Sequence, residues 1–319
     1  MKKRMRFSLI LLALMTLTAC RQVSDKSGQS VKVGIVQYAE HPALDAARQG
    51  FIQALADGDY KEGKNLKLTK KNAQGDQSNL QTMVEQLAGK NDLHFAIATP
   101  AAQALLNADP DTPTVFTAVT DPVSAKLVKS LAKTGGNITG TLDATDVKQQ
   151  IDLLTKVVPQ AKTIGIFYNS SEVNSQTQAK MAEKAIREKG LKAVVKTVTS
   201  SNDVQQVMTS LAGQVDAIYL PTDNTVASTA TTIGQIVKEA KVPTMGSDDA
   251  YLDSLLLTSG VNYKEIGKEA GKKALLILKG KKPSEIPVGK PRKPLVKINP
   301  DMAKALGLDV KTLETIVGQ

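Results

Sequence analysis

The sequence predicts an α/β protein made of two Rossmann-like lobes, each built on a parallel sheet. Short apolar runs alternate with segments whose apolar residues recur at helical spacing. Strands separated by such helices imply right-handed crossovers and sheets covered on both faces. Two series of this kind lie on either side of about residue 141. The chain has 319 residues, which is long enough for two lobes with separate cores.

The first series contains four apolar runs that we expect to be strands. Asp76 or Ser78 is placed to cap the helix that follows the second of them. Pro100 comes directly after the third run and fits the first turn of a helix, where its missing N–H would have no partner. The four expected strands cover residues 31–36, 66–70, 95–98 and 114–119.

The second series starts near Thr163. A helix expected over residues 175–189 ends at Gly190, a residue type favoured just after helices. The four expected strands cover residues 164–167, 193–195, 217–220 and 242–245. We expect the first lobe to comprise residues 31–140 plus about 260–285, and the second lobe to comprise residues 141–259 plus about 286–319.

The first twenty residues predict an exported protein. A basic start leads into an apolar stretch over residues 7–14 that is too short to span a bilayer, which favours a signal peptide over residues 1–19. The stretch closes on Leu17-Thr18-Ala19-Cys20, which resembles a bacterial lipobox, and Cys20 is the only cysteine of the chain. We therefore expect Cys20 to be lipidated and residues 20–30 to form a tether. The alternatives are an ordinary signal peptide with an incidental cysteine, or a short buried helix.

This interpretation places the mature protein outside the cytoplasm. We expect it on the outer face of the cytoplasmic membrane, or in the periplasm if the cell has two membranes. The formal net charge of +10 does not indicate a nucleic-acid partner, because four positive charges lie in the signal peptide and much of the rest lies between Lys264 and Lys297 without interleaved aromatic residues. We expect that basic stretch to be a solvated face near an anionic membrane or wall, with a docking surface for a membrane partner as the alternative.

Polar and turn-forming residues gather at the carboxyl ends of the predicted strands in both series. Ligands of open parallel sheets bind beyond those ends, so two lobes that face each other across them would enclose one small polar molecule. The alternative is that these residues only cap helices and form turns. The candidate binding residues are Gln37, Tyr38, His41, Thr99, Pro100, Thr117, Thr120, Asp121, Asn169, Asp223, Asn224 and Asp248.

At these positions the chain resembles a known family, the ABC-transporter substrate-binding lipoproteins, in the subgroup that includes tryptophan and tyrosine binders. The similar segments are residues 34–45 (GIVQYAEHPALD), 72–76 (NAQGD), 98–103 (ATPAAQ), 116–122 (FTAVTDP) and 220–225 (LPTDNT). The resemblance extends from about residue 31 to 300. It implies a type I periplasmic-binding-protein fold that closes like a clamp on its ligand and delivers that ligand to a membrane permease.

An amino acid ligand needs an acid for its ammonium group. Asp248 is our first candidate and Asp223 the second. The chain has no tryptophan, so stacking on a sugar ring would fall to a few tyrosines, and no arginine lies at a predicted strand end to clamp a phosphate or dicarboxylate. We therefore favour an amino acid over a sugar.

The same ligand needs donors for its carboxylate and a pocket for its side chain. We expect Thr99, with the N–H groups that follow Pro100, to hold the carboxylate together with Thr117 or Thr120. Tyr38, with His41 beside it, is placed to flank an aromatic or apolar side chain.

The sequence does not indicate an enzyme. It has two histidines and shows no metal-ligand cluster, glycine-rich phosphate loop or nucleophile elbow, so we expect no catalysis, no cofactor and no metal. We expect a monomer that receives its ligand and contacts an ABC permease. Two alternatives remain open: a ligand-sensing module for a membrane signalling partner, and an importer receptor for a sugar, nucleoside or peptide.

Overall fold

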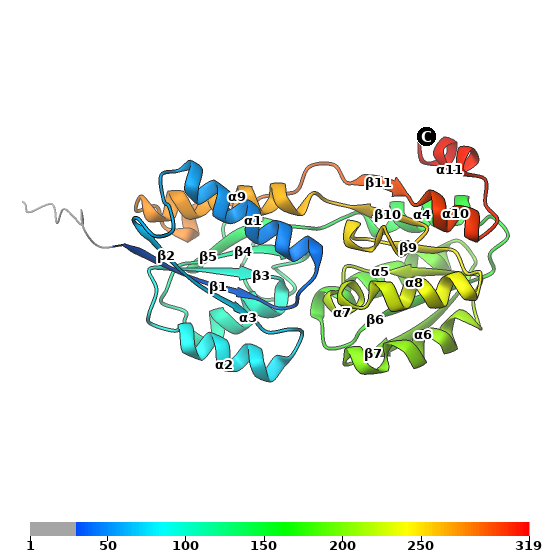
Figure 1. Ribbon diagram of the computed structural model, residues 1–319, viewed down its shortest axis with the longest axis horizontal. Helices are drawn as coiled ribbons and strands as arrows, with labels where there is room; N and C mark the ends of the chain where they lie inside the picture. Colours follow the sequence, from blue (N-terminus) through cyan, green and yellow to red (C-terminus); the bar gives the residue numbers. More distant parts are fainter. Residues whose placement is uncertain (1–29, 319) are drawn as a thin grey trace, which may run out of the picture.

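The computed structural model describes residues 30–318, which form two α/β lobes arranged along the long axis of the molecule (Figure 1). One lobe contains a five-stranded sheet and the other a six-stranded sheet. All strand pairs are parallel except one, so the predicted α/β class with parallel sheets is confirmed. The predicted signal peptide (residues 1–19), Cys20 and the tether up to residue 29 lie outside the described residues. None of the helices in residues 30–318 combines the length and the apolar character needed to cross a bilayer.

The first lobe is built on the five-stranded sheet, in the order β2-β1-β3-β4-β5. Its strands are β1 (Val31–Gln37), β2 (Leu66–Asn72), β3 (Leu93–Ile97), β4 (Thr114–Val119) and β5 (Ile138–Leu142). Its helices are α1 (Pro42–Asp57), α2 (Gln77–Leu87), α3 (Thr99–Ala108) and α9 (Tyr263–Leu278). Figure 1 shows α1 and α9 on one face of the sheet and α2 and α3 on the other, so both faces are covered as parallel sheets require.

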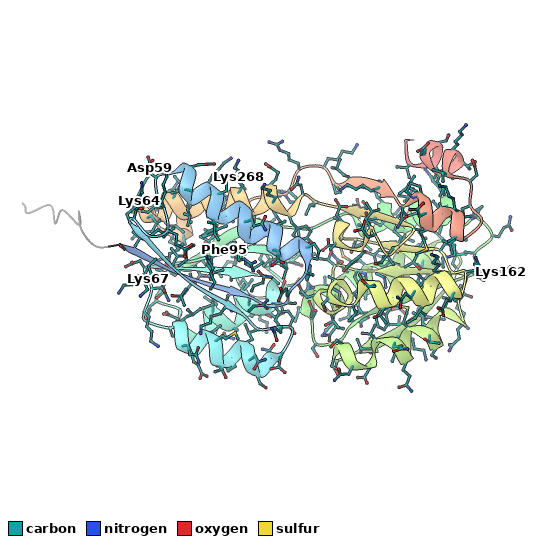
Figure 2. The ribbon with its side chains drawn as sticks, viewed as in Figure 1. Asp59, Lys64, Lys67, Phe95, Lys162 and Lys268 are labelled. Carbon is teal, nitrogen blue, oxygen red and sulfur yellow. The ribbon has the colours of Figure 1, made fainter. Side chains whose placement is uncertain are left out.

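The core of the first lobe lies between this sheet and its helices. Phe51 of α1 stacks on Phe95 of β3 with ring centroids 3.6 Å apart. Figure 2 shows Phe95 inside the lobe, whereas the lysines labelled on the same lobe, Lys64, Lys67 and Lys268, lie at its outer surface. The charged residues of this lobe therefore surround an apolar interior.

The second lobe is built on the six-stranded sheet, in the order β11-β10-β9-β8-β6-β7, with β11 antiparallel to β10. Its strands are β6 (Thr163–Asn169), β7 (Lys192–Val198), β8 (Ala217–Leu220), β9 (Thr244–Gly246), β10 (Leu257–Gly260) and β11 (Leu295–Ile298). Its helices are α4 (Val147–Val157), α5 (Val173–Glu188), α6 (Val204–Ala212), α7 (Asn224–Ser228), α8 (Ala230–Glu239), α10 (Pro300–Ala305) and α11 (Val310–Val317). Separate apolar clusters cover its two faces, one under α4 and α5 and the other under α6 and α8.

Three connections join the lobes. The first runs from β5 to α4, and the second runs from β10 to α9, so α9 returns the chain to the first lobe, where it packs on α1. Short 3₁₀ turns occur at η1 (Ser201–Asp203), η2 (Asp249–Tyr251) and η3 (Pro283–Glu285). After η3, Gly289 still pairs with Thr141 beside the first sheet, and the chain then passes to β11 in the second. Three adjacent crossings are compatible with a hinge.

The expected elements differ from the observed ones in two informative places. Strands β5, β10 and β11 were not among those expected, because β5 and β10 are rich in threonine, serine and glycine and do not form an apolar run. The helical stripe from Val226 to Ala240 is not one helix but two, α7 and α8. They meet at Thr229, whose φ of −113° and ψ of 13° interrupt the helix.

Candidate ligand-binding site

A cavity with a volume of about 240 Å³ lies between the two lobes, where the carboxyl ends of both sheets face each other. In Figure 1 the start of α1 and helix α7 meet across this boundary, and His41 Nε2 lies 3.3 Å from Asn224 Oδ1 there. The lining residues come from both lobes and from the connections between them. They are His41, Leu44, Ala118, Asp143, Asn174, Thr222, Asp223, Asn224, Asp248 and Tyr263.

Two buried aspartates approach one tyrosine at the side of the cavity nearest the hinge. Asp143 follows β5 and accepts hydrogen bonds from Tyr263 Oη at 3.2 Å and Thr120 Oγ1 at 2.9 Å. Asp248 follows β9, caps η2 by accepting from the Ala250 N–H at 2.8 Å, and also interacts with the Tyr263 hydroxyl. Burial raises the pKa of each carboxyl to about 6, and the charge of Asp248 adds to the effect on Asp143.

A second acidic pair belongs entirely to the second lobe. Glu172 accepts from the backbone N–H of Asn224 at 3.1 Å, and Asn174 Nδ2 approaches it at 3.3 Å. Asp223 caps α7 through the Val226 N–H at 2.9 Å and accepts from the Asn169 N–H at 2.7 Å. Burial raises the pKa of both carboxyl groups, and their mutual repulsion raises that of Glu172 further.

No lysine or arginine is among the described residues that line the cavity. The arginine nearest in sequence to this wall, Arg48, is already paired with Asp45 at 3.0 Å and donates to Gln37. Three of the lining residues are carboxylates, with Glu172 directly behind them, so the closed cavity concentrates negative charge that no side chain on its wall neutralises. Buried charges without partners are unfavourable, and a cation inside the cavity would compensate them.

Two buried polar atoms of the cavity wall have no hydrogen-bond partner within the described residues. They are Nδ1 of His41 and Oδ1 of Asn174, and both side chains are 5% exposed. Buried polar atoms are almost always paired in folded proteins. The two atoms therefore mark positions where the cavity wall is prepared for a polar guest.

The cavity brings together four of the twelve candidate binding residues. His41, Asp223, Asn224 and Asp248 line it. Thr120 lies one step behind, because its hydroxyl donates to Asp143 and not into the cavity. Asn169 lies behind Asp223 in the same way, and its Nδ2 donates to Thr225 Oγ1 at 2.7 Å.

The remaining six candidates are not in the lining, and most have partners of their own. The side chain of Gln37 donates to Ala39 O at 2.7 Å and accepts from Arg48. Tyr38 Oη donates to Gly75 O at 3.1 Å, and Thr117 Oγ1 is 2.9 Å from Thr141 Oγ1. The other three are Thr99 and Pro100, which are buried at the start of α3, and Asp121, which accepts from the N–H groups of the turn after it.

Several cavity residues were missed by sequence reasoning. Asp143 follows β5, a strand without an apolar run, and Tyr263 begins α9 beyond the hinge, so neither followed an expected strand. Glu172 and Asn174 come directly after the recognised polar turn at residues 168–171, which is the one signal that pointed to them. In residues 30–318 there is no group of three or more His, Cys, Asp or Glu residues that could hold a metal ion.

Comparisons with known proteins agree with this geometry. The family model described as ABC transporter substrate binding protein matches residues 32–317. The chain is 38% identical over 317 residues to a protein of Clostridioides difficile named tyrosine-binding protein, and the match covers 96% of this chain and 92% of that one.

Two solved structures relate the arrangement of the lobes to ligand binding. The first, from Streptococcus pneumoniae in complex with L-Trp, has a TM-score of 0.86 and 36% identity, covering 91% of this chain and 99% of that one. The second is a ligand-free, open substrate-binding protein with adhesive properties from Clostridium difficile. It has 42% identity and covers 88% of this chain and 95% of that one, but its TM-score is only 0.66.

The more identical structure is therefore the less similar in shape, which indicates that the lobes are closed here as they are in the L-Trp complex. The two parallel-sheet lobes and three connections are those of type I periplasmic binding proteins. With a family match over nearly all of the described residues, the chain belongs to the ABC transporter substrate binding protein family.

Proposed function

We propose that this protein is the lipid-anchored, extracytoplasmic solute receptor of an ABC importer, which binds an amino acid with an aromatic or apolar side chain between its closing lobes and delivers it to a membrane permease. The observation that carries the proposal is the cavity wall with three buried carboxylates and no cationic side chain. An α-ammonium group supplies the missing positive charge. The family consists of solute-binding proteins, which are carriers and not enzymes.

The ammonium group is proposed to lie against Asp143 and Asp248. These carboxyls come from opposite sides of the hinge and approach one hydroxyl, that of Tyr263, so a single cation placed between them interacts with both lobes. Charge-assisted hydrogen bonds of this kind contribute about 1.5–3 kcal/mol each when water is excluded. Ligand binding and lobe closure are thereby coupled.

The carboxylate of the ligand is proposed to bind backbone N–H groups at the start of α1. That helix borders the cavity through His41 and Leu44, and no side chain caps it. The first N–H groups of a helix lack internal partners and favour an anion. Leu44 and Ala118 add apolar surface to the same wall.

The relatives support an aromatic ligand. One is named for tyrosine binding, and another is solved with L-Trp. Calorimetric titration of the full-length protein with the twenty L-amino acids tests the proposal, and we expect binding of tyrosine or tryptophan. Removing the ammonium group, as in 3-(4-hydroxyphenyl)propionate compared with tyrosine, should weaken binding on the order of 10-fold to 150-fold. Absence of heat with every amino acid would remove the proposal.

Lipid anchoring and delivery to a permease need their own experiment. Cys20→Ser should abolish incorporation of labelled palmitate and release the protein from the membrane fraction. Uptake of the labelled ligand by cells should fall in parallel, because the receptor would no longer be held beside its permease. Retention of the variant on the membrane would contradict the anchor.

A further inference from the structure

The side chain of Asn174 has a fixed orientation that leaves an acceptor facing the cavity. Its Nδ2 donates to the carbonyl oxygen of Thr222 at 2.9 Å and approaches a carboxylate oxygen of Glu172 at 3.3 Å. Both partners accept at those positions, so exchanging the two ends of the amide would set oxygen against oxygen. Oδ1 is therefore the atom without a partner, and it is an acceptor.

The ring of His41 has a tautomer that leaves a second acceptor. Asn224 Nδ2 donates to Glu172, so the other end of that amide, Oδ1, accepts. His41 Nε2 lies 3.3 Å from this oxygen and must carry the proton. Burial lowers the pKa of His41 to about 4, against smaller opposing effects of Asn224, Asp45 and Asp223, so the ring is neutral at pH 7. A neutral ring protonated at Nε2 has a bare Nδ1, the second atom without a partner.

The two atoms do not belong to the acidic pair that is proposed to hold the ammonium group. The described hydrogen bonds link Asp143 to Tyr263 and Thr120, and they link His41 and Asn174 through Asn224 and Glu172 in a separate network. The cavity wall thus has one part suited to a cation and another part with two neutral acceptors. A ligand that fills both parts must bring a hydrogen-bond donor in addition to its ammonium group.

We infer that Asn174 Oδ1 and His41 Nδ1 recognise an N–H or O–H donor on the ligand's ring, so that the site selects a tyrosine-like or tryptophan-like amino acid and discriminates against phenylalanine. The inference rests on the proposed function and adds the determinant of specificity. A site built to bond a substrate OH or NH rejects the analogue without it, because the buried acceptors then stay unpaired. Apolar contact alone does not distinguish these rings as strongly.

Matched ligand pairs test the inference on the full-length protein. Tyrosine is compared with phenylalanine, and tryptophan with 1-methyltryptophan, by calorimetry at pH 7.5. We expect the donor-bearing member of the tighter-binding pair to bind at least roughly 10-fold more strongly than its partner. Equal affinity within about 3-fold in the wild-type protein would overturn the inference while leaving the proposed function intact. Failure of all amino acids to bind would instead overturn the proposed function, and the inference with it.

Two variants assign the effect to the named atoms. Asn174→Ala and His41→Phe each remove one acceptor, and Thr177→Ala is the control, because Thr177 lies on the same helix and its hydroxyl bonds only to Val173 O. The readout is the affinity ratio within a ligand pair, since a general structural defect weakens both members equally. We expect the ratio to fall toward 1 in the two test variants and to persist in the control. An unchanged ratio in both test variants would refute the assignment.

The His41 tautomer gives a readout that does not depend on substitution. Nitrogen-15 chemical shifts of the imidazole ring distinguish a protonated nitrogen from a bare one. We expect Nε2 to be protonated and Nδ1 bare in the ligand-free protein, and Nδ1 to shift toward a hydrogen-bonded value when tyrosine or tryptophan is added but not with phenylalanine. A protonated Nδ1 before ligand addition would contradict the inference.

Discussion

Replacing Asp248 by asparagine should weaken the ligand complex and, at the same time, stabilise the ligand-free protein. The side chain keeps its shape and can still cap η2, because an amide oxygen also accepts the Ala250 N–H at 2.8 Å. What is lost is the negative charge in a cavity that has no cationic side chain among its described lining residues. The substitution therefore isolates charge from shape.

The structure sets the size of both effects. The pKa of Asp248 is raised from 3.8 to about 6, a difference that corresponds to about 3 kcal/mol of unfavourable free energy for the ionised form above pH 6. Removing that cost should raise the melting temperature of the ligand-free variant by several degrees at pH 7.5. Losing a charge-assisted hydrogen bond to the ammonium group should weaken binding by about 10-fold to 150-fold.

Thermal melting and calorimetric titration at pH 7.5 measure the two effects on the same sample. Asp249→Asn is the matched control, because Asp249 is adjacent in sequence, is paired with Lys297 at 2.6 Å and does not line the cavity. The control should not become more stable, and its affinity should stay near that of the wild type. Unchanged affinity in Asp248→Asn would refute the ammonium anchor, and a lower melting temperature would refute the account of its burial.

Three further predictions concern pH and packing. Asp143 and Asp248 must be ionised to hold an ammonium group, so affinity should rise with pH through about 6, while the ligand-free closed form should lose stability from about pH 4 to 6 because its raised pKa values favour bound protons; titrations from pH 5 to 8 check this, and a flat affinity profile would count against it. Burial alone would raise the pKa of Asp109, but hydrogen bonds from backbone and side-chain donors hold it near 2, so its contribution to stability is present above about pH 4 and is lost as pH falls through 2. Asp109→Asn should therefore melt below the wild type at pH 7, with the difference shrinking in acid melts; equal melting at pH 7 would contradict this. Gly267→Ala should destabilise by about 1–3 kcal/mol in denaturant titrations, since its Cβ would lie 2.0 Å from Ala47 O, whereas Gly136→Ala meets nothing within 4 Å and should not; equal effects would argue against close packing of α1 on α9.

The fold was predictable because most strands are apolar runs and most helices show a regular apolar stripe. The exceptions have a physical reason. Strand β5 reads Ile-Thr-Gly-Thr-Leu and is buried throughout, with Thr141 Oγ1 bonded to Thr117 and to Ile266 O, so its polar groups are satisfied by neighbours that only the tertiary structure supplies. Gly140 allows this close approach, because a Cβ there would lie 2.2 Å from Phe116 O.

The site was only partly predictable, for a different reason. Sequence reasoning places polar residues at strand ends, and His41, Asp223 and Asp248 do line the cavity. It does not show which strand ends in two separate sheets converge on each other, so Thr99 was as good a candidate as Asp248. Asp143 depends on the chain passing between the lobes beside it, a feature with no local pattern. The convergence of loops across a hinge is a property of the folded chain.

A crystal structure of the protein with L-tyrosine or L-tryptophan tests the central claim most directly. The account predicts one amino acid in the cavity between the lobes, with its ammonium nitrogen about 3 Å from carboxylate oxygens of Asp143 and Asp248. Its ring N–H or O–H should point to Asn174 and His41. A ligand bound outside the cavity, or one whose carboxylate occupied the position given to the ammonium group, would contradict it.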